Sequence, residues 1–238
     1  MEQLRTVFEP VAAAMPRPDS QSEPKARQLV RDRVFEAVRD AIVEGRIAPG
    51  TRLTERELCE AFGISRTVVR EIVRRLEAEK LADVVAHRGV RVATLTRKSV
   101  TEIYQIRTEL EALIVRNFLA VATDRDVATA QEFGEKLLDA GRRHDRVGLA
   151  QTMMQFDQFM TEVADMPVLS DMIAQLRTRI TMLRVLALAE PGQLETGMDG
   201  VRAIIAGITA RDAGAAENAV RVYVRRSGEA VLRHMDEG

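Results

Sequence analysis

The sequence predicts a mainly α-helical chain, in which a small N-terminal domain of short helices closed by a β-hairpin precedes a bundle of about six helices. Apolar residues recur every three or four positions through most of the chain, and glycine and proline interrupt these runs. Only residues 82–95 change to a β-prone pattern. With 238 residues, 46% of them hydrophobic, the chain can bury a substantial core.

Residues 1–24 contain four prolines among scattered polar side chains, which predicts a flexible N-terminal arm. A helical stripe of apolar residues follows from about Ala26 to Glu44, and Gly45 ends it. We therefore place the small domain at residues 25–95.

Two short helices are predicted next. The first starts at the capping-box spacing of residues 54–57 and runs to about Phe62. Ser65 can cap the second, which runs to about Lys80, and Gly63 lies in the turn between them.

Beyond Ser99 the pattern indicates helices alone, separated by breakers such as Pro167 and Gly214. The predicted helices span residues 99–123, 125–141, 146–165, 168–189, 199–210 and 213–235. Because no strand pattern intervenes, residues 99–238 are expected to form an all-α bundle.

Charge is divided unevenly along the chain, although the formal net charge is -1. Residues 25–98 carry 17 Lys and Arg against 11 Asp and Glu, whereas residues 99–238 carry 16 against 21. A basic domain joined to an acidic one is typical of a nucleic-acid binder with a separate sensing or assembly domain. An ordinary fluctuation of solvated charges along the chain explains this uneven distribution equally well, so the choice between the two explanations depends on the motifs.

The cellular compartment follows from what the sequence lacks. The single cysteine, Cys59, excludes an intrachain disulfide and a cysteine-rich zinc site. The apolar runs are too short to span a bilayer, and the first ten residues carry Glu2 and Glu9 without a continuous apolar stretch. We expect a cytoplasmic protein that has no membrane partner.

The residues around Gly63 meet the requirements of a helix-turn-helix, which are apolar facing sides, a small residue at the closest approach and glycine in the turn. The inward set is Leu58, Phe62, Ile64, Val69 and Ile72, with Cys59 as the small residue. Together with the hairpin, this set predicts a winged helix-turn-helix, which is a DNA-binding domain. Any pair of antiparallel helices buries apolar residues similarly, so only the residues of the exposed face can distinguish a DNA-binding helix-turn-helix from an ordinary helical hairpin.

The second helix of this pair presents polar and basic residues at its N-terminal end, the end that enters the major groove. Arg66 and Arg70 can bond a guanine edge, while Ser65 and Thr67 can bond phosphate oxygens. Arg56, on the first helix, is expected to lie near the DNA backbone.

The hairpin tip has the residues that insertion into a minor groove requires, because Arg88 supplies a long cation and Gly89 permits close approach. His87 is explained equally well as a polar turn residue. For Arg74 and Arg75, farther along the second helix, contact with phosphate and pairing with nearby glutamates remain alternatives.

The run from Val34 to Ala93 resembles the DNA-binding domain of the GntR family of bacterial transcription regulators. The motifs that carry this resemblance include the turn Pro49-Gly50, the segment Ser65-Arg66-Thr67-Val68-Val69-Arg70-Glu71 and the wing residues Arg88-Gly89. One departure is Glu79-Lys80-Leu81, where the family commonly has a glycine before the leucine.

The later helices resemble the FadR-type branch of this family. The matching segments are Tyr104-Gln105-Ile106-Arg107 with Leu110-Glu111, Pro167-Val168-Leu169 and residues 210–216. The resemblance implies an all-α C-terminal domain that binds an effector and dimerises. It also implies a homodimer bound to a palindromic operator in double-stranded DNA, released or reoriented by a small molecule, often a carboxylic acid.

Many members of this branch hold a divalent metal with one aspartate and three histidines. Counted from the matching motifs, those positions fall on Met153, Asp157, Val201 and Tyr223. The three histidines, at positions 87, 144 and 234, lie elsewhere. A tight site needs several converging nitrogen or oxygen donors, so we expect no metal and no other cofactor.

Effector recognition would then fall to side chains of the bundle interior: Arg107, Asp157, Arg184 and Tyr223. A buried arginine can bind a carboxylate with two hydrogen bonds, and a tyrosine hydroxyl can orient it. A structural ion pair between Arg107 and Asp157, with Tyr223 as a structural hydrogen-bonding group, is an equal alternative.

The leading functional hypothesis is a metabolite-responsive repressor. An enzyme is not expected, because the sequence has neither a nucleophile-base constellation nor a phosphate-cradling glycine loop. The alternative is a DNA-binding dimer whose helical domain senses no ligand, and a DNA footprint unchanged by any metabolite would favour it.

Overall fold

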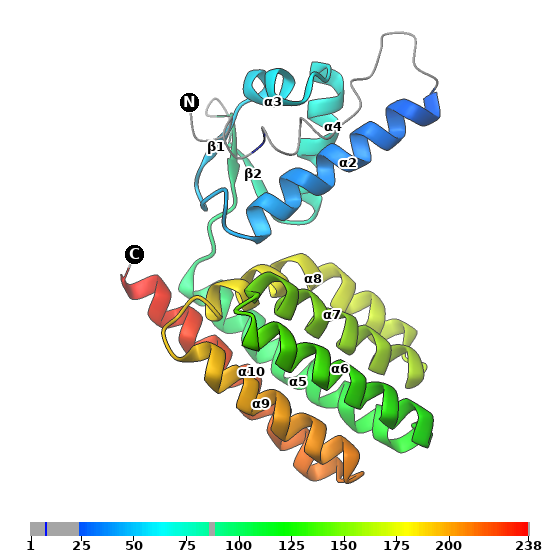
Figure 1. The fold of residues 1–238 in the computed structure, drawn as a ribbon. Coiled ribbons are helices and arrows are strands. Elements are labelled where there is room, and N and C mark those ends of the chain that lie inside the picture. Colours follow the sequence, from blue (N-terminus) through cyan, green and yellow to red (C-terminus); the bar gives the residue numbers. More distant parts are fainter. Residues whose placement is uncertain (1–7, 9–23, 86–88, 238) are drawn as a thin grey trace. The chain divides into compact units, whose positions relative to one another are not determined.

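The structure is a computed structural model that describes residue 8, residues 24–85 and residues 89–237. The chain divides into two compact units, Met1–Leu95 and Thr96–Gly238. Helices dominate both units, and within the described ranges strands occur in the first unit alone (Figure 1). The predicted fold class is confirmed.

The first unit contains three helices, α2 (Pro24–Val43), α3 (Glu55–Phe62) and α4 (Arg66–Ala78). The Thr54 hydroxyl caps α3 by accepting from the Glu57 N–H at 3.2 Å, as the capping-box spacing predicts. Gly63 ends α3 with φ at 63°, a left-handed conformation that glycine adopts without a steric penalty.

The end of α4 lies at Ala78, two residues before the predicted end, and it is a Schellman motif. The Leu81 N–H donates to the Leu76 carbonyl at 2.8 Å, and the Lys80 N–H donates to the Glu77 carbonyl at 3.0 Å. Lys80 has φ at 59°, in the left-handed region. Glycine adopts this conformation without a steric penalty, so a lysine here is the less favourable residue.

A three-stranded antiparallel sheet follows the order β1-β3-β2, with β1 (Arg52–Leu53), β2 (Ala82–Val85) and β3 (Gly89–Val92). The two longer strands form the predicted hairpin, in which Val84 pairs with Val90. Strand β1 was not predicted, because two residues are too short to show an alternating pattern.

The core of the first unit holds the inward set that the sequence predicts. Leu58, Phe62, Ile64, Val69 and Ile72 are all buried, together with residues of α2 such as Val34 and Val38. Cys59 is half-buried. Phe8 is also buried, with its ring centroid 4.9 Å from that of Phe62. Of the rest of the predicted flexible arm, Pro24 begins α2 and residues 1–7 and 9–23 lie outside the described residues.

The second unit contains helices that run alongside one another (Figure 1). They are α5 (Arg97–Val121), α6 (Asp124–Arg142), α7 (Arg146–Val163), α8 (Pro167–Ala187), α9 (Gln193–Thr209) and α10 (Ala213–Glu237). Helix α10 packs against α5, α8 and α9, while α7 packs against α5, α6 and α8. Each helix therefore packs one face into a core that the helices of this unit share.

Helix α9 starts at Gln193, six residues before the predicted start, because Gly197 lies inside the helix instead of preceding it. Glycine also allows α9 to approach α10 closely. A Cβ on Gly207 would lie 2.7 Å from the backbone nitrogen of Ala216.

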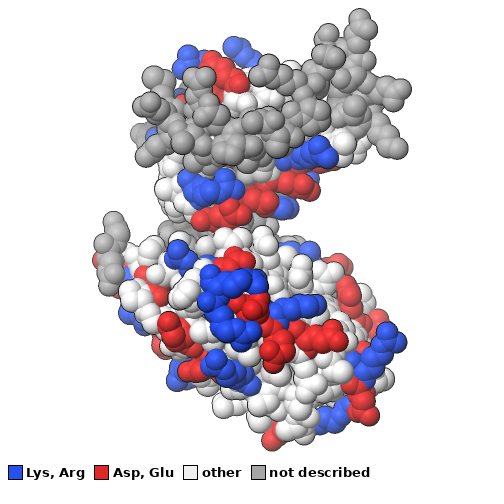
Figure 2. Space-filling model, in the orientation of Figure 1, with Lys and Arg blue, Asp and Glu red and all other residues white. Residues whose placement is uncertain are grey.

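No helix in the described ranges is long and apolar enough to cross a membrane. On the face drawn in Figure 2, acidic and basic side chains are interspersed over the helical unit.

Candidate DNA interface and effector site

The candidate DNA-reading residues lie at the start of α4, and the packing of this helix exposes them. Val69, Ile72 and Val73 are buried on its inner side, whereas Ser65, Arg66, Thr67 and Arg70 are exposed. The Ser65 hydroxyl caps the helix by accepting from the Val68 N–H at 3.4 Å. The free N–H groups and dipole of this helix end favour an anion such as phosphate.

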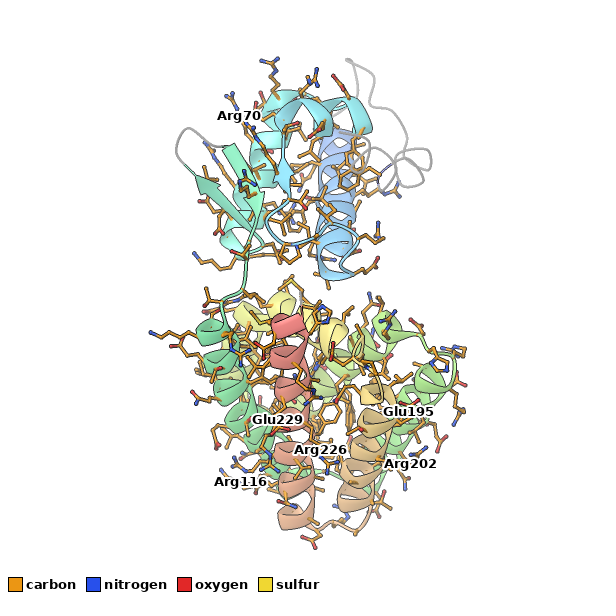
Figure 3. The ribbon with its side chains drawn as sticks, turned by 90° about the vertical axis from the view of Figure 1, so that its left-hand side faces the viewer. Arg70, Arg116, Glu195, Arg202, Arg226 and Glu229 are labelled. Atoms are coloured by element: carbon orange, nitrogen blue, oxygen red, sulfur yellow. The ribbon has the colours of Figure 1, made fainter. Side chains whose placement is uncertain are left out.

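The two candidate base-reading arginines differ in their surroundings. Arg70 Nε donates to Glu55 Oε1 at 2.8 Å, in an exposed ion pair between α4 and α3 (Figure 3 labels Arg70). This glutamate raises the pKa of Arg70, so the guanidinium stays charged. Arg66 has no hydrogen bond or ion pair to any part of the chain that the structure describes. An exposed ion pair is weak, so the pair with Glu55 does not keep Arg70 from contacting DNA.

Arg56 is exposed on α3, and its Nε lies 3.8 Å from Glu60 Oε1. In the wing, Gly89 is exposed with φ at 81° and begins β3. The side chain of Arg52 lies against Gly89, 3.6 Å from where a Cβ would stand. Arg88 and His87 lie outside the described residues, so their predicted places at the tip of the wing remain predictions.

Of the two arginines with alternative explanations, Arg75 faces α2. Its Nη1 lies 2.6 Å from Asp32 Oδ1, and its guanidinium stacks over the Phe35 ring at 3.8 Å from the centroid. Both partners of Arg75 lie on α2, whereas the pairing considered from the sequence was with nearby glutamates. Arg74 is exposed.

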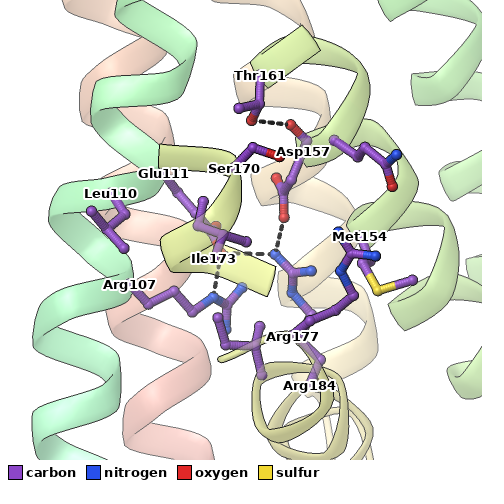
Figure 4. A pocket seen from close by; sticks show the side chains of 12 residues that line it. Arg107, Leu110, Glu111, Met154, Asp157, Thr161, Ser170, Ile173, Arg177 and Arg184 are labelled. Carbon is purple, nitrogen blue, oxygen red and sulfur yellow. Dashed lines mark hydrogen bonds and ion pairs between the residues drawn. The ribbon is translucent and has the colours of Figure 1, made fainter. Parts of the chain in front are cut away.

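A buried cluster of charged side chains joins three helices of the second unit (Figure 4). Glu111 Oε1 accepts from Arg107 Nε at 2.5 Å and from Arg184 Nη2 at 2.8 Å. Asp157 Oδ2 accepts from the same Arg184 nitrogen at 2.6 Å. Arg107 and Arg184 are only 1% and 2% exposed, so these pairs are shielded from water.

Burial and neighbouring charge set the pKa values in this cluster. Burial, supported by the charge of Glu111, raises the pKa of Asp157 to about 6. The pKa of Glu111 is lowered because the attraction of two arginines outweighs its burial. The cluster therefore contains one carboxylate that stays ionised and one that can hold a proton near neutral pH.

A small cavity lies beside the cluster. Its lining combines the charged Arg107, Glu111, Asp157, Arg177 and Arg184 with the polar Gln158, Thr161 and Ser170 and with several apolar side chains. It leaves about 20 Å³ for the centres of water molecules, enough for one or two waters. Tyr223 is buried close enough to feel the charges of Arg184 and Arg107, but it is not among the lining residues.

The structure thus brings together three of the four predicted effector residues, Arg107, Asp157 and Arg184. The ion pair between Arg107 and Asp157, one of the two alternatives from the sequence, is not formed, since Arg107 bonds Glu111 and Asp157 bonds Arg184. Glu111 was absent from the predicted site. Its spacing of four residues from Arg107 is the signal that could have identified it.

The positions at which related proteins hold a metal do not fit one here. Met153 and Val201 are buried residues without an oxygen or nitrogen donor in the side chain, and Asp157 is already bound to Arg184. Within the described part of the chain, no three His, Cys, Asp or Glu side chains converge. His234 instead pairs with Glu190 at 2.8 Å, and His144 lies in a turn.

A winged helix-turn-helix with an exposed basic recognition helix, joined to an all-α unit with a buried polar cluster, defines a DNA-binding regulator with a separate helical domain. Residues 30–92 match the family described as bacterial regulatory proteins, gntR family, and residues 102–226 match the FCD domain. The chain belongs to the GntR family of transcription regulators, in the FadR-type branch that carries an FCD domain.

Curated relatives agree with this assignment. The HTH-type transcriptional regulator YdhC of Bacillus subtilis is 25% identical, over 86% of this chain and 92% of that protein. The HTH-type transcriptional repressor RspR of Escherichia coli is 24% identical, over 88% of this chain and 92% of that protein. The solved structure of E. coli McbR/YncC has the same fold, with a TM-score of 0.70 at 24% identity, over 87% of this chain and 98% of that one. The members of this family, including these relatives, are transcription regulators and not enzymes.

Proposed function

We propose that the chain is a homodimeric repressor that binds a palindromic operator through the start of α4 and changes its DNA affinity when a small effector enters the helical unit. One observation carries this proposal. Ser65, Arg66, Thr67 and Arg70 are exposed together at the N-terminal end of a helix whose opposite side is buried. This is the end that a recognition helix places in the major groove.

Each of these residues has a distinct proposed role. Arg66 and Arg70 bond guanine O6 and N7, for which Arg70 leaves Glu55. Ser65 and Thr67 bond phosphate oxygens beside the N-terminus of α4. Arg56 bonds the DNA backbone, and Arg88 with Gly89 enters the minor groove.

The buried cluster supports a sensing role for the helical unit. Arg107, Asp157 and Arg184 surround a cavity, with Tyr223 nearby, and arginines in such a place favour a carboxylic acid. The name of RspR supports repression as the sign of regulation. The site of action is the bacterial cytoplasm, where operator DNA lies.

The test begins with selection of bound sequences from random duplex DNA by the full chain, followed by fluorescence anisotropy. Arg66→Ala and Arg70→Ala should each remove most of the preference for the selected operator over random DNA, roughly tenfold or more per arginine at the contacted base. Arg202→Ala, an exposed change on α9, is the control for lost charge (Figure 3). If both arginine variants keep full preference, α4 is not the reading helix.

A DNA-binding dimer that senses no ligand is the second candidate. The small size of the cavity favours it. The buried ion pairs favour it as well, because they can serve only to join the helices. A footprint on the selected operator that no cell metabolite changes would support this candidate over the first.

A further inference from the structure

Arg74 continues the row of exposed arginines along α4. It follows Arg66 and Arg70 at intervals of four residues, so the three side chains leave the helix on the same side. A rise of about 1.5 Å per residue places Arg74 about 12 Å beyond Arg66 along the helix axis. The major groove is itself about 12 Å wide. When the start of α4 lies in this groove, Arg74 therefore reaches the phosphate backbone at its edge.

Arg74 also lines an open groove of the protein between α2 and α4. The other lining residues are Gln28, Arg31 and Asp32 of α2 and Glu71 and Arg75 of α4. All six carry polar or charged groups, so this groove does not favour an apolar ligand. The three arginines against two carboxylates leave one positive charge in excess. The lining therefore suits an anion that stays in contact with water, as the phosphates of DNA do.

The ion pairs across this groove leave the excess charge on Arg74. Arg31 Nη1 donates to Glu71 Oε2 at 3.1 Å, and Arg75 Nη1 donates to Asp32 Oδ1 at 2.6 Å. Both carboxylates thus have an arginine partner on the facing helix. Arg74 has no hydrogen bond or ion pair to any residue that the structure describes. Its guanidinium can bind an external anion without breaking a contact.

The pair between Arg31 and Glu71 also affects whether a phosphate can approach. Glu71 lines the same groove as Arg74, and its negative charge would repel the DNA backbone if it had no partner. The pair is partly exposed and adds little stability. It nevertheless places the opposite charge within hydrogen-bonding distance, which cancels most of the field that Glu71 would exert on a phosphate.

We propose that Arg74 binds a backbone phosphate at the edge of the major groove, and that Arg31 supports this contact by neutralising Glu71. The inference rests on the proposed function, because it extends the contact of α4 from the base edges to the strand beside them. It gives Arg74 a role that does not depend on the DNA sequence, unlike the roles of Arg66 and Arg70.

The salt dependence of DNA binding tests the contact. Fluorescence anisotropy of the full chain is measured on the selected operator and on random duplex DNA, between about 50 and 200 mM KCl. Arg74→Ala should weaken binding to both DNAs by the same factor, roughly threefold to tenfold, and should reduce the slope of log Kd against log salt concentration by about one. The preference for operator over random DNA should not change, in contrast to Arg66→Ala.

Arg33 provides the matched control, because it is an exposed arginine of α2 that does not line the groove. Arg33→Ala removes the same charge from the same unit and should leave the slope unchanged. An unchanged slope for Arg74→Ala would overturn the phosphate contact, and so would an equal change for Arg33→Ala. A loss of operator preference in Arg74→Ala would also overturn it, because Arg74 would then read a base edge.

Uncharged methylphosphonates, introduced at one phosphate at a time along each half-site, locate the contact. At one position beside the bases that Arg66 and Arg70 protect, the substitution should weaken the unmodified chain but not Arg74→Ala. If every position weakens both chains equally, Arg74 binds no phosphate.

A double variant tests the role of Arg31. Arg31→Ala leaves Glu71 without its partner and should weaken DNA binding. Arg31→Ala combined with Glu71→Gln restores the balance of charge and should recover the affinity of the unmodified chain to within about twofold. If the double variant stays as weak as Arg31→Ala, or if Arg31→Ala has no effect, neutralisation is not the role of Arg31. Circular dichroism verifies that each variant is folded.

The two proposals fail in different ways. A chain that selects an operator through Arg66 and Arg70, but whose slope does not change in Arg74→Ala, refutes this inference alone. A chain that selects no operator refutes the proposed function, and the slope on random duplex DNA then still tests Arg74.

Discussion

Asp157 is the residue whose chemistry depends most on its surroundings. An aspartate in water titrates near 3.8, but burial and the neighbouring Glu111 raise its pKa to about 6 in the folded chain. Nothing in the local sequence around Asp157 predicts this shift. It arises because α5 and α7 bring two carboxyl groups to the same guanidinium.

The shift predicts how stability depends on pH. Between about pH 4 and pH 6 the folded chain holds a proton on Asp157 that the unfolded chain has released, so this carboxyl contributes stability at low pH that is lost as pH rises through about 6. Asp157→Asn cannot lose a proton. The free energy of unfolding of this variant, relative to the unmodified chain, should therefore increase from pH 4 to pH 7.

Urea denaturation followed by circular dichroism at several pH values measures this difference. Asp199→Asn, an exposed change on α9, should give a curve parallel to that of the unmodified chain. If the Asp157→Asn curve is also parallel, the carboxyl is ionised throughout this range and its pKa is not raised.

At the scale of the element, the end of α4 shows how a backbone position limits the choice of residue. Lys80 occupies the left-handed conformation that closes the Schellman motif, and its Cβ makes that conformation costly. The motif places Leu81 in the core, directly before β2. The same position in the chain therefore ends the recognition helix and starts the wing.

Replacement of Lys80 by glycine should stabilise the chain. The relief of steric strain exceeds the added flexibility of the unfolded state, so we expect a gain of about 0.5 to 1 kcal/mol in the free energy of unfolding. Lys80→Ala removes the same charge but keeps the Cβ, and it should give no such gain. Thermal unfolding of the two variants distinguishes the effects, and equal stabilisation by alanine would mean that charge and not backbone strain is responsible.

At the scale of the whole molecule, the proposed dimer requires a fixed distance between two half-sites. Two recognition helices related by a two-fold axis reach the same side of DNA only when the half-sites lie about one helical turn or a multiple apart. Insertion of five base pairs into the centre of the selected operator places the half-sites on opposite sides. Affinity should then fall roughly tenfold or more, as measured by anisotropy.

A symmetric operator that tolerates this insertion would contradict the dimer, because each half-site would then be bound independently. Sedimentation velocity with the unmodified operator gives the number of chains per duplex and serves as the control.

The sequence by itself determined the class of this protein. Helical periodicity, the turn at Gly63 and the caps at Thr54 and Ser65 are local features. Each is formed by hydrogen bonds between residues that are close in the sequence. The exposed basic residues of α4 followed for the same reason, since a helix with one buried side must expose the other. The errors in the predicted elements also have local causes, because β1 is too short to show an alternating pattern and Gly197 inside α9 resembles a helix break.

The tertiary structure alone decided how the buried charges pair. The sequence identified Arg107, Asp157 and Arg184 as interior residues, but the one ion pair it offered as an alternative joined Arg107 to Asp157, and the predicted site did not include Glu111. Glu111 is four residues from Arg107 and 73 from Arg184, so the second bond depends on how α5 and α8 pack. Because a buried charge is stable only beside its partners, this packing determines the pKa of Asp157, and it leaves Nη1 and Nη2 of Arg107 buried without a hydrogen-bond partner among the described residues.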